Sequence, residues 1–240
     1  MIRKFQETIY LHYHENPRNL PWRKTQSPYR IFVSEIMLQQ TQVERVTEKY
    51  RQVIRAFPSF GSLAKAPLSD VLRVWQGMGY NRRAIALKRA AEIIVKEYKG
   101  RLPSSEEELV KLPFVGNYTA SAILTFAFDL PTVFIETNIR RVYIHFFFDD
   151  REGVRDNEIF PLLEKTLDRS HPRQWYSALM DYGVMVKKQV VNPNRRSAHY
   201  QKQAPFRGSN RQVRGMILRL LVKRPGVTAK GIMKELGGDP

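Results

Sequence analysis

The chain has 240 residues, which suffices for one large domain or for two lobes with a sizeable core. It contains no cysteine, and this excludes disulfides, thiol catalysis, zinc–thiolate sites and iron–sulfur clusters held by cysteine. The net charge of +17 indicates a polyanionic partner. Residues 184–240 carry 13 Lys or Arg against 2 Asp or Glu, although a basic tail is equally compatible with a solvating role.

The first 23 residues contain no apolar core of signal-peptide length, and no run in the chain approaches about 18 apolar residues. We therefore expect a cytoplasmic protein without a membrane partner. The five histidines are scattered, which predicts no metal site.

Helical spacing of apolar residues runs through most of the chain. Such residues recur at intervals of three and four in residues 34–57, 84–98 and 157–167. Residues 132–148 (TVFIETNIRRVYIHFFF) are rich in β-branched and aromatic residues, but they lack convincing strand alternation. The sequence therefore predicts an all-α fold.

The helical pattern is interrupted by a hairpin signal at residues 107–124 (EELVKLPFVGNYTASAIL). It predicts a helix that Ser105 and Glu108 can cap, a tight turn, and a second helix whose N-terminal N–H groups can bind a phosphate oxygen. The stretch resembles the helix-hairpin-helix motif LPGVGxxTA, which grips the DNA backbone without reading sequence. Phe114 replaces the first glycine of that motif, and an ordinary connection between two helices is the alternative.

The composition of the chain changes near residue 190. Residues 191–208 form a polar, basic stretch that predicts an extended segment. Residues 209–240 predict a short helical appendage that resembles the first half of a helix-turn-helix, with plain helical packing as the alternative.

Three further stretches extend the resemblance beyond the hairpin. They are residues 20–43 (LPWRKTQSPYRIFVSEIMLQQTQV), 74–91 (VWQGMGYNRRAIALKRAA) and 133–142 (VFIETNIRRV). In this order, from about Leu20 to about Lys188, the chain resembles MutY-type adenine DNA glycosylases of the helix-hairpin-helix, or endonuclease III, superfamily. The resemblance implies two helical lobes around a DNA-binding cleft.

The implied glycosylase domain covers residues 1–190. A six-helix barrel lobe would occupy about 25–130, and a second lobe would combine residues 1–24 with 131–190. In the family, four cysteines that hold an iron–sulfur cluster usually follow; here the segment 191–208 replaces that loop, so no such cluster and no other cofactor is expected.

The resemblance also implies a division of chemical roles between two acids. Breaking an N-glycosidic bond requires protonation of the departing base and stabilisation of a positive sugar. The general acid of the family matches Glu35, whose pKa burial would raise; a helix-terminal surface acid is the alternative. The cation-stabilising Asp matches Glu136, one methylene longer, and Asn138 also matches.

Tyr118 occupies the position at which strand-cleaving relatives carry a Lys that forms a Schiff base. A tyrosine cannot form one, so the resemblance implies a monofunctional glycosylase that leaves an abasic site. Tyr118 would then form a hydrogen bond near the developing charge.

Recognition residues match the family in part. Arg23 matches a position close to the extruded base, and Gln40 matches a residue that wedges into the duplex. The second Tyr of a family GLGYY stretch is Asn81 here, and the Gln or Glu that touches adenine is Ser177. Further DNA- or base-binding positions implied by the resemblance are Gln39, Tyr80, Val115, Gly116, Asn117 and Thr119.

These observations predict a monofunctional DNA glycosylase of base excision repair, which acts as a monomer on double-stranded, nucleoid DNA and removes adenine opposite 8-oxoguanine or guanine. Ser177 and Asn81 leave open a glycosylase for mispaired thymine, uracil or an alkylated purine. Glu136, Thr137 and Phe114 depart from the family pattern and leave open a non-catalytic binder of DNA damage.

Overall fold

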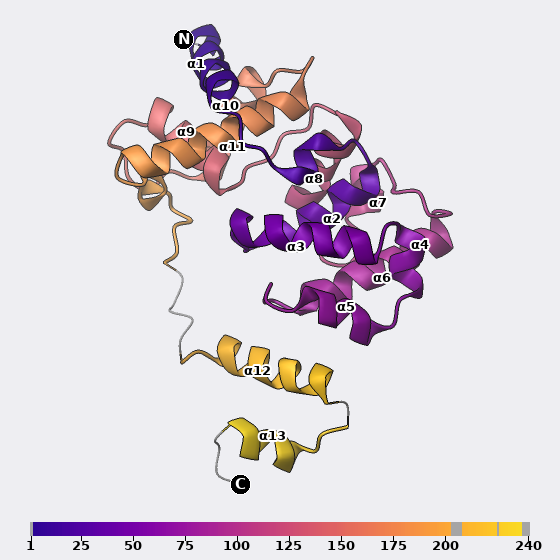
Figure 1. The fold of residues 1–240 in the computed structure, drawn as a ribbon. Coiled ribbons are helices and arrows are strands. Elements are labelled where there is room, and N and C mark those ends of the chain that lie inside the picture. Colours follow the sequence, from indigo (N-terminus) through magenta and orange to yellow (C-terminus); the bar gives the residue numbers. More distant parts are fainter. Residues whose placement is uncertain (1, 203–207, 225, 237–240) are drawn as a thin grey trace. The chain divides into compact units, whose positions relative to one another are not determined.

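The computed structural model describes residues 2–202, 208–224 and 226–236, and their regular elements are helices (Figure 1). Within these ranges, pairing of the strand type is limited to an isolated bridge between Val154 and Ser197. The prediction of an all-α fold is therefore confirmed for the described residues. In chain order the helices are α1 (Ile2–Glu15), η1 (Pro21–Lys24), α2 (Pro28–Leu38), α3 (Val43–Ala56), α4 (Phe60–Lys65), α5 (Leu68–Trp75), α6 (Arg82–Glu97), α7 (Glu106–Leu109), α8 (Asn117–Phe128), α9 (Thr137–Phe147), α10 (Asp156–Thr166), α11 (Pro172–Gln189), η2 (Pro193–Arg196), α12 (Asn210–Lys223) and α13 (Ala229–Leu236).

The chain divides into two compact units. Unit 1 combines Met1–Phe32, Ser104–Lys111 and Val115–Lys202, and unit 2 combines Val33–Pro103, Leu112–Phe114 and the described part of Gln203–Pro240. The lobe and domain bounds inferred from the sequence stay a prediction. None of the described helices is both long and apolar enough to cross a membrane.

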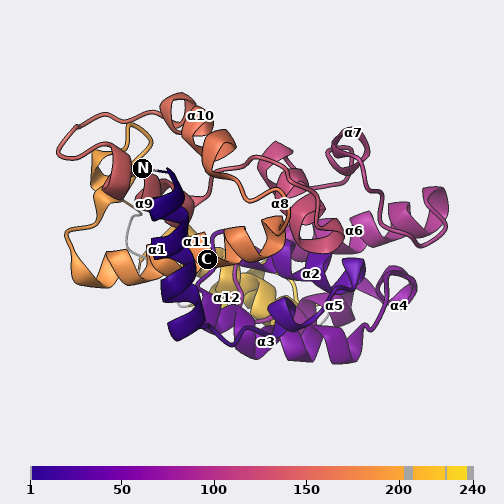
Figure 2. The ribbon, with the colours of Figure 1, turned by 90° about the horizontal axis from the view of Figure 1, so that it is seen from above.

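Unit 1 is built around α11, which packs against α9, α1 and α8. Figures 1 and 2 both show α1 next to α11, with the two helices crossing. Pro172 starts α11 at a position that lacks an intrahelical N–H partner in any case, so its fixed φ favours the helix start. The core of this unit is a cluster of buried side chains that includes Phe5, Ile9, Phe134, Ile139, Tyr143, Trp175, Tyr176 and Leu179.

Helix α9 forms although its sequence is rich in β-branched and aromatic residues. Its buried side chains Ile139, Val142 and Tyr143 follow helical spacing, so one face of the helix enters the core. The preceding residues 130–136 form no regular element. Tertiary burial thus outweighs the local strand preference of this stretch.

Unit 2 is organised around α6, which packs against α4 and α5. Ala84, Leu87, Ala91 and Ile94 are buried along one stripe of α6, and the small alanines permit close helix packing. The stretch 34–57 with continuous helical spacing forms two helices, α2 and α3, because residues 39–42 make a turn between them. Helix α12 contacts α5 and α13.

The hairpin predicted at residues 107–124 has a short first arm. Helix α7 has four residues, and the Ser105 hydroxyl accepts a hydrogen bond from the Glu108 amide at 3.3 Å. Helix α8 packs against α7 and carries a run of buried small residues. Phe114, in the turn between the two helices, has a φ of 63° and thus adopts the left-handed conformation that favours glycine.

Candidate functional site

The first candidate site lies at the N-terminus of α9, where Glu136 is the residue that caps the helix. Its carboxylate accepts hydrogen bonds from the backbone N–H groups of Asn138 at 2.7 Å and Ile139 at 2.9 Å. These are two of the donors that a helix start leaves without intrahelical partners. The backbone therefore fixes the carboxylate, and the extra methylene of Glu does not prevent the contact.

Asn138 links this carboxylate to a buried arginine. Its side-chain N–H group donates to Glu136 at 3.2 Å, and its oxygen accepts from Arg141 at 2.7 Å. Arg141 is 3% exposed and also donates to the backbone oxygen of Gly183 at 2.7 Å. Glu136 and Asn138, which the sequence placed together, thus share one network, and Arg141 anchors it to α11.

The segment after α11 braces the same turn. Asn192 accepts a hydrogen bond from the Arg141 side chain at 2.9 Å, and Asn194 donates to the backbone oxygen of Thr137 at 2.8 Å. Both asparagines belong to residues 191–208, the stretch that the sequence predicts in place of the cysteine-bearing loop of the family. The start of α9 is therefore held by side chains from its own helix and from residues 192–194, and by the backbone of α11.

The electrostatics of Glu136 combine opposing effects. Burial raises the pKa of Glu136 above its usual value, although part of the side chain remains accessible to solvent. The two backbone N–H donors and the nearby charge of Arg141 act in the opposite direction, but burial outweighs them. Burial likewise lowers the pKa of Arg141.

Tyr118 lies in the first turn of α8, with 39% of its surface exposed. Its ring contacts Phe134 edge-on, with 5.7 Å between the ring centroids. Phe134 in turn stacks on Tyr176 at 3.9 Å. Since Phe134 stands two residues before Glu136, packing connects Tyr118 to the segment that carries the capping carboxylate.

Arg23, which the resemblance places near an extruded base, has its guanidinium bound to a carboxylate. It donates to both oxygens of Asp181, at 2.6 and 2.8 Å, and to the backbone oxygen of Ser177 at 3.2 Å. The Asp181 side chain is 1% exposed, and Ser177 is 4% exposed. This bidentate pair fastens η1 to α11, and the proposed base contacts of Arg23 and Ser177 stay predictions.

In unit 2, Glu35 lies on α2 and is 8% exposed, between Ser34 and Ile36, which are 1% and 0% exposed. The turn that follows α2 carries Gln39 and Gln40. Gln39 donates through its amide to the backbone oxygen of Phe114 at 3.0 Å, and Gln40 has a left-handed φ of 53°. The structure therefore ties this turn to the hairpin turn.

The other positions predicted to contact DNA lie in two places. Tyr80 is 38% exposed with a φ of 48°, and Asn81 precedes α6. Gly116 and Asn117 are exposed at the start of α8, whose N-cap Gly116 makes no side-chain capping bond. Val115 and Thr119 are buried, so these two support the turn and the helix instead of presenting side chains.

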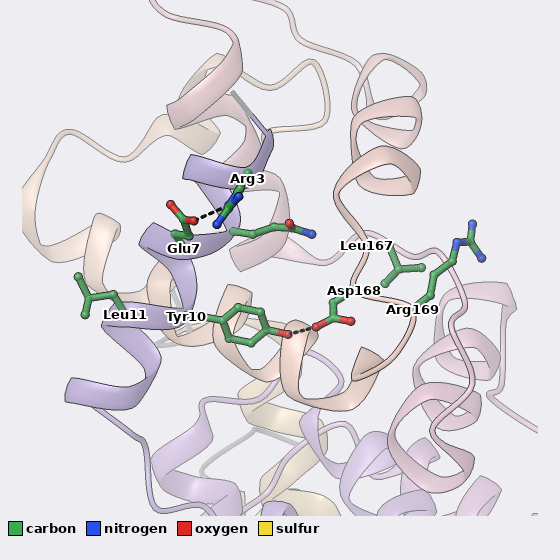
Figure 3. A pocket seen from close by; sticks show the side chains of 8 residues that line it. Arg3, Glu7, Tyr10, Leu11, Leu167, Asp168 and Arg169 are labelled. Atoms are coloured by element: carbon green, nitrogen blue, oxygen red, sulfur yellow. Dashed lines mark hydrogen bonds and ion pairs between the residues drawn. The ribbon is translucent and has the colours of Figure 1, made fainter.

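A groove of about 710 Å³ lies between α1 and the segment after α10 (Figure 3). Across it, Tyr10 donates to Asp168 at 2.7 Å, and Gln6 donates to the backbone oxygen of Thr166 at 2.9 Å. None of the site residues predicted from the sequence lines this groove. Its polar groups hold α1 in place.

Comparison with known proteins identifies the family. A model of the HhH-GPD superfamily of base excision DNA repair proteins matches residues 33–166, which are more than half of the chain. The chain belongs to this superfamily. The resemblance inferred from the sequence is thereby confirmed, and the matched HhH-GPD segment includes Glu35, the hairpin and Glu136.

Relatives of this HhH-GPD protein carry the name adenine DNA glycosylase. That of Buchnera aphidicola subsp. Baizongia pistaciae is 37% identical over 187 residues, which are 76% of this chain and 52% of that protein. That of Homo sapiens is 32% identical over 197 residues, which are 77% of this chain and 36% of that protein. The chain thus spans about half the length of the first of these relatives, and less of the second.

Solved structures with the same fold include a thermostable thymine-DNA glycosylase, with a TM-score of 0.73 and 27% identity over 80% of this chain and 90% of that one. An endonuclease III trapped in a covalent intermediate with DNA has a TM-score of 0.59 and 20% identity, over 85% and 89% of the two chains. The second likeness shows the fold alone.

Residues that sequence reasoning did not select also shape the HhH-GPD site. Arg141 stands three residues after Asn138, and this spacing on one helical face is a signal that could have found it. Gly183 lies inside α11, where a glycine is unfavourable unless close packing requires it. Asp181 gave no signal beyond its charge.

We expect Gly183→Ala to disrupt the turn that carries Glu136. A Cβ at residue 183 would lie 2.4 Å from the backbone oxygen of Asn138, so α11 and α9 would have to separate. Such overpacking costs about 1–3 kcal/mol, with a loss in Tm of about 2–4 °C for each kcal/mol. Thermal unfolding measures this; Gly61→Ala, whose Cβ would meet its nearest atom at 3.8 Å, is the control and should not lower Tm. Equal Tm values for the two variants would contradict the close approach.

We expect Glu136→Gln to gain stability relative to the wild type as the pH rises. Because the folded pKa of Glu136 is raised, its stabilising contribution is complete below the unfolded pKa and is lost as the pH rises through the folded pKa. The amide of the Glu136→Gln variant does not titrate, so its contribution to stability does not fall as the pH rises. Melting both proteins at about pH 4 and about pH 8 should show a Tm difference that shifts in favour of the variant at the higher pH.

Any packing disturbance from the amide is present at both pH values, so the change in the Tm difference isolates the carboxylate charge. A difference that stays constant with pH would contradict the raised pKa of Glu136.

Proposed function

We propose that this protein is a DNA N-glycosylase that hydrolyses the N-glycosidic bond of adenine mispaired with 8-oxoguanine or guanine. The observation that carries the proposal is the carboxylate of Glu136, fixed by two backbone N–H groups and by Asn138 at the start of α9. The names of the relatives, adenine DNA glycosylase, support adenine as the base.

In the proposed reaction, the ionised Glu136 carboxylate stabilises the positive sugar that forms as the bond between C1′ and the base nitrogen breaks. Glu35 in its protonated form donates a proton to the departing base. A water molecule then bonds to C1′ and gives up one proton to the carboxylate that the first step left on Glu35. The products are the free base and an abasic site in DNA.

Two features support duplex DNA as the substrate. The excess of positive charge, +17, favours a polyanion. The start of α8 exposes Gly116 and Asn117 beside a helix N-terminus, which suits a phosphate. These contacts position DNA without reading its sequence, so base choice would come from other residues, and we propose that the protein acts as a monomer on mismatched duplexes.

A second candidate function is removal of mispaired thymine. The likeness to a thermostable thymine-DNA glycosylase, with a TM-score of 0.73, favours it. The buried Ser177, where the resemblance implies a Gln or Glu that touches adenine, favours it as well. A duplex with thymine opposite guanine therefore belongs in the assay.

We also propose that the domain works without an iron–sulfur cluster. The chain has no cysteine to donate thiolate ligands, and the amides of Asn192 and Asn194 are bonded to the α9 region. These residues do not fit a cluster of that kind. No step of the proposed reaction uses one.

We expect alkali-labile sites at adenine when the protein is incubated with duplexes that carry adenine opposite 8-oxoguanine or guanine. Glu35→Gln should lower the single-turnover rate by about a hundredfold or more, because general acid catalysis contributes about 10²–10⁴. Gel electrophoresis after alkali measures the product.

The exposed Glu97 at the end of α6 supplies the matched control, since Glu97→Gln makes the same chemical change at a residue outside the predicted site. Its rate should equal that of the wild type. Cleavage at thymine alone would contradict the proposal for adenine and support the second candidate, removal of mispaired thymine. Binding without cleavage of any duplex would leave a non-catalytic damage binder.

We expect the product strand to remain intact until alkali is added, because Tyr118 offers no amine for a Schiff base. Borohydride should trap no adduct with the wild type, whereas Tyr118→Lys should give a covalent adduct with abasic DNA. Denaturing gels measure both. Strand cleavage by the wild type without alkali would refute the monofunctional assignment.

A further inference from the structure

Arg83, a buried cation in unit 2, caps the end of helix α2. It lies in the first turn of α6 and is 2% exposed. Its guanidinium donates to the backbone oxygens of Ile36 at 3.1 Å and Met37 at 2.8 Å. Because the last turn of α2 contains no basic residue of its own, Arg83 supplies the positive charge that helix C-termini favour.

The same guanidinium holds the turn that follows α2. It donates to the backbone oxygen of Gln39 and, at 2.7 Å, to the hydroxyl of Thr41. Gln40, between these two residues, has a left-handed φ of 53° and an exposed side chain. Both neighbours of this strained residue are thus bound to one side chain.

Arg83 also holds the turn that precedes α6. It donates to the backbone oxygen of Gly79 at 3.3 Å, and its Cζ lies 5.4 Å from the ring centroids of both Trp75 and Tyr80. Tyr80 is a second exposed residue with a left-handed backbone, at a φ of 48°. One guanidinium therefore joins two turns that are far apart in the sequence.

A third left-handed residue is connected to this network through Gln39. The Gln39 amide donates to the backbone oxygen of Phe114, which has a φ of 63° and is 48% exposed. A bulky residue in this conformation is rare and persists where surrounding contacts determine it. Because about half of Phe114 is exposed, burial of its ring contributes little stability, and packing alone does not explain a bulky residue in this conformation.

We propose that Arg83 is a positioning residue for base extrusion: it holds Gln40, Tyr80 and, through Gln39, Phe114 in strained backbone conformations that present their side chains to duplex DNA. This inference rests on the proposed function and adds Phe114 to the residues that contact DNA. Arg83 itself touches no substrate. Its role is to fix the distance between the turns.

The chemistry of the guanidinium suits this role. Burial lowers the pKa of Arg83 to about 10, so the charge is held at a cost to the folded state, yet the group stays protonated at neutral pH. Its two terminal nitrogens have different partners: Nη1 binds the end of α2, and Nη2 binds Thr41 and Gly79. A lysine carries the same charge on one nitrogen and cannot span both turns.

The test compares Arg83→Lys with Arg82→Lys, a matched change at the exposed neighbouring position of the same helix. Both are measured in a Glu35→Gln background on a duplex with 2-aminopurine in place of the target adenine, whose fluorescence rises when the base unstacks. The dissociation constant is measured on the same duplex. Single-turnover rates are measured with Glu35 intact and normalised to the active fraction.

We expect Arg83→Lys to reduce the fluorescence rise and the normalised rate about tenfold or more, because misplacement by about 1 Å can cost about a hundredfold in rate. The dissociation constant should change by less than about threefold, since phosphate contacts dominate DNA affinity. Arg82→Lys should match the parent. A rate and fluorescence rise for Arg83→Lys within about threefold of the parent would overturn the inference.

If Arg83→Lys fails to fold, Thr41→Val tests the inference in its place, because it removes one acceptor of the guanidinium and keeps the branched shape of the side chain. We expect the same loss of fluorescence rise, smaller in size, at an unchanged dissociation constant; no loss would overturn the inference. Extrusion without excision by the otherwise wild-type protein would contradict the proposed function alone. Excision with no fluorescence rise in the parent would contradict the role in extrusion alone.

Discussion

The carboxylate of Glu136 at the start of α9 is the constraint on which the candidate site of unit 1 depends. A helix start leaves N–H groups without partners, and an acceptor there contributes about 0.5–2 kcal/mol. The residues that usually cap a helix start have shorter side chains than Glu. Glu136 nevertheless reaches the N–H groups of Asn138 and Ile139, at 2.7 and 2.9 Å. Because the backbone holds the carboxylate, any movement of the α9 start also moves the proposed reactive group.

Two buried arginines organise the described parts of the two units in the same chemical manner. Arg83 binds carbonyl and hydroxyl oxygens, and Arg141 binds the side-chain oxygens of two asparagines and a backbone carbonyl. Arg23 differs, since its charge is matched by Asp181. A guanidinium bound to neutral acceptors keeps its positive field, and the field of Arg141 favours the ionised form of Glu136 against the effect of burial.

Helical periodicity predicted the fold class, and the resemblance to the family motif, not periodicity, placed Glu136 and Asn138 in one site. Periodicity did not reveal the break at residues 39–42, because it depends on a left-handed Gln40 that distant contacts of Arg83 sustain. Nor did a motif reveal that Arg23 is bound to Asp181. From sequence alone, a charged residue is expected at the surface. Whether it is buried depends on hydrogen-bond acceptors that other helices supply.

Residues 192–194 support the site without contributing a reactive group. Pro193 begins the short helix η2 with a fixed φ, and this sets the spacing between Asn192 and Asn194. One asparagine accepts from Arg141 and the other donates to Thr137, so both flank the residues that Glu136 caps. Segments separated by some fifty residues thus converge on one turn, so the surroundings of the capping carboxylate depend on contacts that are distant in the sequence.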